Sequence, residues 1–270
     1  MMSHVDLFSG VGGFALASHW AGFQTVAFCD NNPWCQTIIR KHWTGVPIHD
    51  DIRNFPGRDY RGSTLLTGGF PCQPFSQCGK RRGKNDDRYL WPEMLEIIKV
   101  VRPTWVVAEN VYNVVRMVLP TVIADLEAER YRVVVLLLPA HGVGAPHRRR
   151  RAFVVAESLD TNSNSLGLHR EEMHEHGKGN QIELRHQQGS VIGSMVSPQI
   201  WERIDPRVFG VADGISDRMD EDERKERKER IKGLGNAVVP LVAYQILKAI
   251  ADVHNDQNKE LTDCKILNHS

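Results

Sequence analysis

A cysteine held between two prolines is the first feature of this sequence with chemical potential. Cys72 lies in the stretch Gly69-Phe70-Pro71-Cys72-Gln73-Pro74. Proline fixes its own φ angle and pushes the residue before it out of the helical region, so the thiol has little conformational freedom. The thiolate is the nucleophilic form, and a free thiol has a pKa of about 8.5, so the surroundings must activate it. The alternative is an inert cysteine in a turn, because free cysteine is among the most buried residue types.

A carboxylic acid follows one of the most apolar stretches of the chain. Glu109 ends the predicted strand 104–109, which reads Thr-Trp-Val-Val-Ala-Glu. In the predicted topology this strand end lies beside the Cys72 loop. A carboxylic acid whose pKa is raised by apolar surroundings can protonate a nitrogen of a substrate. The alternative is a solvated charge at the end of a strand.

A glycine-rich turn and two acids form a further candidate site. Gly10, Gly12 and Gly13 follow the first predicted strand, and Asp30 ends the second, where an acid can hold both ribose hydroxyls of an adenosine. A nicotinamide fingerprint needs a third glycine later than Gly13, so S-adenosylmethionine, which has no pyrophosphate, fits better than NAD. Asp51 is a candidate for the adenine amino group. The alternatives are an ordinary tight turn for the glycines and a helix cap for Asp51.

Alternating strand and helix patterns position these residues. Strands are predicted at 4–8, 24–30, 63–67 and 104–109. Helices are predicted from 13 to about 21, from 33 to 42, from 90 to 101 and from 120 to 129. Two apolar runs at 133–138 and 152–156 predict an antiparallel pair at one edge. The whole predicts a doubly wound α/β sheet of the Rossmann-like kind, in which ligands bind at the carboxyl ends of the strands.

The character of the sequence changes after residue 157. We expect a first domain at 1–157, a small polar region at 158–210, a return to the first domain at 211–256 and a frayed tail at 257–270. Within the third part, the charged stretch 220–230 pairs acids with bases four residues apart, which is typical of an exposed helix without a site. The last helix is predicted from Asn236 to about Val253.

Composition limits the classes of function. The chain has 270 residues, a formal net charge of +1 and five cysteines without a Cys-x-x-Cys pair, which favours a reducing cytosol and no disulfide framework. The four histidines at 169, 174, 176 and 186 lack zinc-finger spacing with cysteines, so no metal site is predicted. No apolar run reaches membrane-spanning length, and residues 1–9 lack the pattern of a signal peptide. A nucleic-acid partner would need a local basic patch, and the lack of a spare apolar helix favours a monomer.

Five short stretches carry the strongest pattern in the sequence. They are Asp6–Gly13, Gly69–Ser76, Glu109–Val111, Gly144–Arg151 and Gly235–Pro240. Together and in this order they resemble the DNA (cytosine-5)-methyltransferase family, of bacterial or phage type. The resemblance covers residues 5 to about 250 and implies the methyltransferase form of the Rossmann-like fold, with 158–210 as a short target-recognition region.

The resemblance implies a division of labour among the catalytic residues. Cys72 matches the thiolate that adds to C6 of cytosine and makes C5 reactive toward the methyl group of S-adenosylmethionine. Glu109 matches the acid at N3, and Arg149 and Arg151 match the paired arginines that orient the base and Glu109. No side chain is assigned to removal of the C5 proton, for which a water molecule is a candidate.

The resemblance also implies a set of cofactor contacts. Phe8 and Ile52 would sandwich adenine, and Asn236 would close the methionine end. The full set carried over from the family is Phe8, Gly10, Gly12, Asp30, Asp51, Ile52, Pro71, Asn236 and Val238.

A base inside a duplex cannot reach Cys72, so the target would be flipped out of double-stranded DNA. A glycine-bounded basic loop is predicted to close over the phosphates, in a manner that weakens with salt. Its expected DNA contacts are Ser76, Gln77, Lys80, Arg81, Arg82, Lys84 and Arg88. The alternative is a solvated loop. The resemblance also allows a cognate restriction endonuclease on a separate chain. A cytoplasmic location is expected from the cysteine pattern, which favours a reducing cytosol.

Three other functions stay open at this point. A transfer RNA cytosine-5 methyltransferase would resemble the same motifs, and a non-catalytic DNA-binding relative would hold S-adenosylmethionine as a structural ligand. A thiol hydrolase would need a histidine near Cys72, for which His147 is the candidate. His147 also stands where the family commonly has glutamine, and the 158–210 region is short for the family, so the recognised sequence is not predicted.

Overall fold

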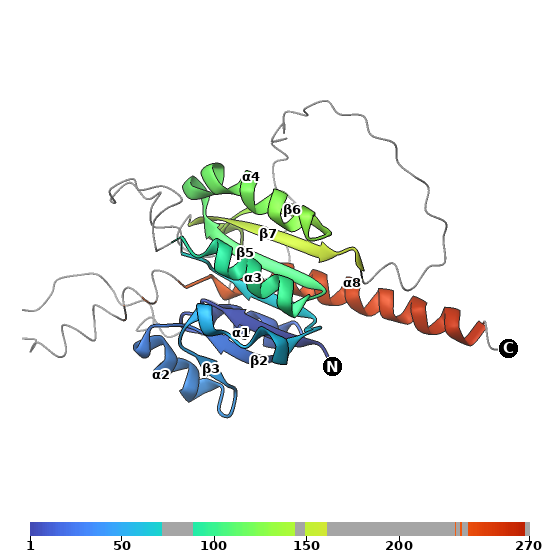
Figure 1. The fold of residues 1–270 in the computed structure, drawn as a ribbon, viewed down its shortest axis with the longest axis horizontal. Helices are drawn as coiled ribbons and strands as arrows, with labels where there is room; N and C mark the ends of the chain where they lie inside the picture. Colours follow the sequence, from blue (N-terminus) through green and yellow to red (C-terminus); the bar gives the residue numbers. More distant parts are fainter. Residues whose placement is uncertain (72–88, 144–148, 161–229, 231–232, 234–236, 268–270) are drawn as a thin grey trace, which may run out of the picture.

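A single mixed sheet organises the computed structural model, which describes residues 1–71, 89–143, 149–160, 230, 233 and 237–267 (Figure 1). Within these residues the strand order is β3-β2-β1-β4-β5-β7-β6. The strands are β1 (Ser3–Leu7), β2 (Gln24–Cys29), β3 (Ile48–His49), β4 (Leu65–Gly68), β5 (Trp105–Val111), β6 (Tyr131–Pro139) and β7 (Arg150–Ser158). Strands β1 to β5 are parallel to one another, and β7 runs antiparallel between β5 and β6. The predicted doubly wound α/β sheet and its antiparallel edge pair are confirmed.

Helices cover both faces of the sheet. They are α1 (Gly13–Trp20), α2 (Pro33–His42), α3 (Trp91–Val101), α4 (Tyr112–Ala128) and α8 (Pro240–Leu267), with short 3-10 helices η1 (Ile52–Asn54), η2 (Gly57–Tyr60) and η5 (Ala140–Val143). One core cluster joins α3 and α4 to the sheet, and a second joins α1 and α8 to its other face (Figure 1). The functional strand ends are therefore held between two packed layers.

Side chains of strand β5 alternate between the two core clusters on the opposite faces of the sheet. Val106 and Ala108 belong to the core with α3 and α4, and Val107 belongs to the core with α1 and α8. Because successive side chains of a strand point to opposite faces, Glu109 continues on the α1 and α8 side and Asn110 on the α3 and α4 side. The two polar residues at the end of this strand therefore lie on opposite faces of the sheet.

Helix α2 begins as its sequence predicts. The Asn32 side chain accepts hydrogen bonds from the backbone N–H groups of Trp34 and Cys35, and Pro33 occupies the first helical position. Asparagine is a preferred N-cap, and proline fits the first turn because its missing N–H is not needed there. This cap fixes the direction of the chain just after the acid at the end of β2.

Two helices differ from their predicted bounds. Helix α4 begins at Tyr112 rather than near Pro120, and proline lies inside it. Burial of Val118, Val122 and Leu126 on one side of the helix offsets the hydrogen bond that Pro120 removes. Helix α8 begins at Pro240 and continues to Leu267, so the predicted frayed tail is wrong through that residue. No glycine or second proline interrupts this stretch, which leaves nothing to end the helix earlier.

The chain reverses its direction of winding at β1. Strand β1 lies between β2 and β4, so the connections that follow β1 and β4 leave toward opposite sides. In open α/β sheets a ligand crevice forms at such a switch point, outside the carboxyl ends of the strands. The glycine loop after β1 and the residues 69–71 after β4 both lie at this position.

Candidate active site

The loop after β1 turns through left-handed backbone conformations. Phe8, Gly10 and Gly12 have φ angles of +52°, +54° and +83°. Among the described residues, no heavy atom lies within 4 Å of a Cβ atom added at Gly10, whereas one at Gly12 would lie 2.6 Å from the ring of Trp43. Gly10 therefore borders open space at the end of β1, while the protein's own tryptophan fills the space beside Gly12.

Asp30 connects the end of β2 to this loop. Its Oδ2 accepts a hydrogen bond from the Gly10 N–H at 2.7 Å, and its Oδ1 accepts one from the Asn32 N–H at 2.9 Å. Burial raises the pKa of Asp30, and the two amide hydrogen bonds act in the opposite direction. A carboxylate offers about four lone-pair positions, so acceptor capacity remains for ligand hydroxyls. This geometry supports the predicted role of Asp30 in binding a ribose.

The predicted adenine contacts lie at the same end of the sheet. Phe8 packs against the core cluster that contains Ile52, which is buried. Asp51 caps η1 by accepting a hydrogen bond from the Arg53 N–H at 2.9 Å, so the helix cap considered as its alternative role is present. Burial, and then the charges of Asp30 and Asp51, raise the pKa of the neighbouring Cys29 thiol to about 12. Recognition of adenine by Asp51 stays a prediction.

Glu109 is a buried acid in an ion pair. Its side chain is 9% exposed, and its Oε1 lies 2.8 Å from Nε of Arg151. A Cβ atom at Gly69 would lie 3.5 Å from its Oε2, so the carboxyl rests against the backbone three residues before Cys72. Burial raises the pKa of Glu109 to about 6, while the charges of Arg151 and then Arg149 act in the opposite direction. A pKa raised in this way keeps the proton on the carboxyl to a higher pH, which suits a proton donor.

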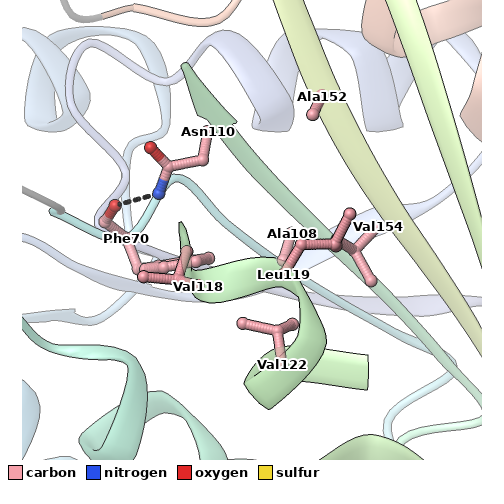
Figure 2. Close-up of a pocket in the computed structure, with 8 residues that line it drawn as sticks. All are labelled: Phe70, Ala108, Asn110, Val118, Leu119, Val122, Ala152 and Val154. Atoms are coloured by element: carbon pink, nitrogen blue, oxygen red, sulfur yellow. Dashed lines mark hydrogen bonds between the residues drawn. The ribbon is translucent and has the colours of Figure 1, made fainter. Parts of the chain in front are cut away.

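Asn110 anchors the segment that leads to Cys72. Its Nδ2 donates a hydrogen bond to the Phe70 carbonyl oxygen at 2.9 Å (Figure 2). Its Oδ1 accepts one from the Val111 N–H at 2.8 Å. Both Asn110 and Phe70 are buried. Asn110 belongs to the Glu109–Val111 motif, but the sequence alone predicts no role for it. The signal was its polar side chain directly after an apolar strand, since such a group needs a partner when buried.

A small apolar cavity lies behind this anchor. Figure 2 shows side chains from α4, β5 and β7 around it, next to the hydrogen bond between Asn110 and Phe70. Its lining residues are Phe70, Ala108, Asn110, Val118, Leu119, Val122, Ala152 and Val154. The cavity belongs to the packing that supports the segment before Cys72.

The two arginines of the predicted pair have different partners. Arg151 faces Glu109, whereas Nη2 of Arg149 donates a hydrogen bond to the Ala237 carbonyl oxygen at 2.7 Å. Ala237 precedes Val238, a predicted cofactor residue that packs against Gly13: a Cβ there would lie 2.8 Å from Val238 Cγ1. The structure thus connects Arg149 to the C-terminal motif, while its charge also acts on Glu109.

A buried polar network that sequence reasoning missed lies beneath the loop. His4 Nε2 and Thr67 Oγ1 are 2.8 Å apart, and Thr67 Oγ1 donates a hydrogen bond to Asp6 Oδ1 at 2.8 Å. Burial raises the pKa of Asp6 well above its ordinary value. Ser9 Oγ donates to the Asp6 carbonyl oxygen at 2.7 Å. The network joins β1 and β4 at the switch point. The only sequence signal for it is the presence of polar residues inside otherwise apolar strands.

Comparison with known proteins identifies the family. A family model described as C-5 cytosine-specific DNA methylase matches residues 2–207. The chain belongs to this family. The matched range contains the glycine loop, the Cys72 segment, Glu109 and both arginines of the methylase motifs.

Curated members of the methylase family match part of the chain. The type II methyltransferase M2.BsuMI of Bacillus subtilis (strain 168) is 33% identical over 172 residues, covering 59% of this chain and 43% of that protein. The type II methyltransferase M.NgoMIV of Neisseria gonorrhoeae is 42% identical over 108 residues, covering 40% of this chain and 35% of that protein. These alignments span less than half the length of either relative.

Solved structures share the methylase fold. The Dnmt2 methyltransferase of S. pombe has a TM-score of 0.51 at 22% identity, covering 64% of this chain and 57% of that one. A DNA modification methyltransferase encoded within a prophage of E. coli has a TM-score of 0.50 at 20% identity, covering 60% and 48%. At this level of identity the likeness shows the fold alone, which is the Rossmann-like methyltransferase fold predicted from the sequence.

Several predicted site residues lie outside the described part of the chain. These are Cys72, Asn236 and the expected DNA contacts Ser76, Gln77, Lys80, Arg81, Arg82, Lys84 and Arg88. The same holds for His147, for most of the 158–210 region and for all of the charged stretch except Arg230. Their roles and the domain division stay predictions. Among the described residues, no three histidine, cysteine or acidic side chains gather as a metal site, and no helix is long and apolar enough to cross a membrane.

Proposed function

We propose that this chain is a DNA (cytosine-5)-methyltransferase that uses S-adenosylmethionine as its methyl donor. One observation carries the proposal in a member of this family: Glu109 is buried beside Arg151, with a pKa raised to about 6, against the backbone that leads to Cys72. A proton donor and a cysteine segment placed together match the two groups that this reaction needs.

The described residues fit the methyl donor. Open space borders Gly10, and the Asp30 carboxylate retains acceptor capacity beside it for the ribose hydroxyls. Phe8 and Ile52 supply apolar surface for adenine. When bound, S-adenosylmethionine supplies an electrophilic methyl group, and the chain's own residues bind and orient it.

Cys72 and Glu109 would share the chemistry at the base. The Cys72 thiolate forms a bond to C6 of cytosine while Glu109 gives its proton to N3, so that no negative charge builds up on the ring. After C5 has gained the methyl group, a water molecule takes the C5 proton. The bond between sulfur and C6 then breaks, N3 returns its proton to Glu109, and the products are 5-methylcytosine and S-adenosylhomocysteine.

Arg151 would keep Glu109 ready for this proton transfer. Its guanidinium fixes the carboxyl at 2.8 Å and opposes the effect of burial on the pKa of Glu109. Burial alone would hold the group protonated, and full ionisation would leave it without a proton to give. The balance between burial and the arginine charge leaves a proton that can be given and regained near neutral pH.

The proposed substrate is a cytosine flipped out of double-stranded DNA. Flipping costs a few kcal/mol and exposes C6 to a thiolate that cannot reach it in the stack. We assign contacts with the phosphates to the basic loop 76–88, and a cytoplasmic location and a monomeric state accompany the proposal. The curated relatives are type II methyltransferases, which supports a cognate endonuclease on a separate chain.

The test is methyl transfer to nucleic acid. Purified protein is incubated with tritiated S-adenosylmethionine and either unmethylated bacterial DNA or transfer RNA, followed by bisulfite sequencing, in parallel with Cys72→Ala. We expect cytosine-5 methylation of DNA at one short recurring sequence, and none with the variant. Labelling of transfer RNA alone would show that transfer RNA, and not DNA, is the substrate. Cofactor binding without labelling of either nucleic acid would favour a non-catalytic DNA-binding protein.

A further inference from the structure

Arg149 connects two parts of the site that lie far apart in the sequence. It directly precedes β7, and its Nη2 donates a hydrogen bond across 88 positions to the Ala237 carbonyl oxygen at 2.7 Å. A guanidinium has five N–H donors in a fixed plane, so one arginine can hold several groups in a set geometry. Here one of those donors is committed to the segment 237–239, which precedes α8.

The segment 237–239 is held closely on its other sides. A Cβ atom at Gly13 would lie 2.8 Å from Val238 Cγ1 and 2.9 Å from the Val238 carbonyl oxygen. The Ala237 N–H donates to the Gly233 carbonyl oxygen at 3.0 Å. These contacts leave little room for the segment to shift without displacing its neighbours.

Gly233 itself is fixed from helix α2. A Cβ atom at Gly233 would lie 2.4 Å from Cζ3 of Trp34, so the ring occupies the place of a side chain. The segment 237–239 is therefore fixed from α1, through Gly233 from α2, and by Arg149 from the sheet. Two of these contacts lie on the cofactor side of the site, and the third leads to the base side.

Arg149 also acts on the acid at the base side. Burial lowers the pKa of Arg149, while the Glu109 charge acts in the opposite direction. The positive charge of Arg149 in turn opposes the effect of burial on the pKa of Glu109. The Arg151 charge lowers the pKa of Arg149, as expected of two cations near the same carboxyl. Arg149 thus lies within electrostatic reach of the Glu109 and Arg151 pair while its hydrogen bond holds the segment 237–239.

From this arrangement we infer that Arg149 is a positioning residue that couples cofactor binding to binding of the target base. A cofactor bound against the segment 237–239 acts on Arg149 through the hydrogen bond to Ala237, and through Arg149 on the Glu109 and Arg151 pair. By thermodynamic linkage the effect is reciprocal, so target DNA tightens cofactor binding by the same factor. This inference rests on the proposed function.

The test compares cofactor affinity with and without DNA. Calorimetry measures the Kd of S-adenosylhomocysteine for the full chain alone and with a duplex that carries the sequence found by bisulfite mapping. For the wild type we expect tighter binding with DNA by a factor in the usual range of about 5 to 150. Arg149→Lys keeps the positive charge near Glu109 but has no planar fork, so we expect the factor by which DNA tightens cofactor binding to fall to about 1.

Two further variants keep the test decisive. Arg132→Lys is the matched control, because Arg132 pairs with Glu157 near the other end of β7, and it should keep the wild-type factor. Gly233→Ala disturbs the same segment through Trp34 without touching Arg149, and it should lower the factor too. It decides the question if Arg149→Lys does not fold, which circular dichroism reports.

The possible outcomes separate this inference from the proposed function. The inference is overturned if the wild type methylates DNA but binds S-adenosylhomocysteine equally well with and without DNA. It is also overturned if DNA tightens cofactor binding to Arg149→Lys as much as to the wild type. Either result leaves the proposed function intact. A wild type that methylates no DNA contradicts the proposed function itself, and with it the inference.

Discussion

Replacing Glu109 by glutamine is expected to stabilise the protein at neutral pH while removing its activity. Burial raises the pKa of Glu109 from 4.5 to about 6, so folding makes ionisation of this carboxyl less favourable. Below pH 4.5 the group is protonated in both the folded and the unfolded state, and the benefit of the raised pKa is fully present. As pH rises through 6 that benefit is lost, and the gap between the two pKa values corresponds to about 2 kcal/mol. Glutamine has nearly the same shape and cannot ionise, so the variant keeps its stability.

Urea unfolding of both proteins between pH 4 and pH 7.5 measures this effect. The free energy of unfolding of Glu109→Gln, relative to wild type, should increase by about 2 kcal/mol over that range. Glu127→Gln is the control, because Glu127 is exposed, and it should show no such change. The difference in free energy of unfolding between Glu109→Gln and wild type could instead stay constant across the range or change in the opposite direction. Either result would refute the conclusion that Glu109 is a buried acid whose pKa is raised by folding.

Three further substitutions test the supports of the site. Asn110→Leu removes the donor to the Phe70 carbonyl, which should cost about 1–3 kcal/mol in urea unfolding and lower kcat more than tenfold with little change in cofactor Kd. Asp30→Asn directs an amide group at one of two backbone N–H donors, so calorimetry should show cofactor binding at least tenfold weaker, and unchanged affinity would exclude Asp30 from the cofactor site. Gly12→Ala places a Cβ 2.6 Å from the Trp43 ring at a φ angle of +83°, which should cost at least about 1–3 kcal/mol in chemical unfolding, and wild-type stability would contradict this packing.

The sequence predicts the parts of the fold that depend on local pattern. The strand that ends before the glycine loop, the capped start of α2 and the antiparallel edge pair all follow from neighbours within a few residues. Glu109 could be predicted at the site because it ends an apolar strand, and ligands bind at the carboxyl ends of the strands in such a sheet. Where a local rule competed with burial, as with Pro120 inside α4, burial decided the outcome.

The partners of the functional side chains could not be predicted in the same way. Asn110 meets a carbonyl 40 residues away, and Arg149 meets one 88 residues away. Such pairs depend on how distant elements pack, and the local sequence pattern carries no information about that. The family resemblance assigned both arginines to the base and Glu109, and only the three-dimensional arrangement separates Arg151 at the acid from Arg149 at the segment 237–239.

The most direct test of the central claim is to trap the bond between Cys72 and cytosine. A long DNA synthesised with 5-fluorocytosine in place of cytosine carries the analogue at every recognition site that it contains, and its C5 fluorine cannot leave as a proton does. With S-adenosylmethionine present, we predict a complex of protein and DNA that survives denaturing electrophoresis, with the modification on Cys72 by mass spectrometry and no complex with Cys72→Ala. A protein that methylates DNA but forms no such complex, or forms it through another residue, would contradict Cys72 as the nucleophile.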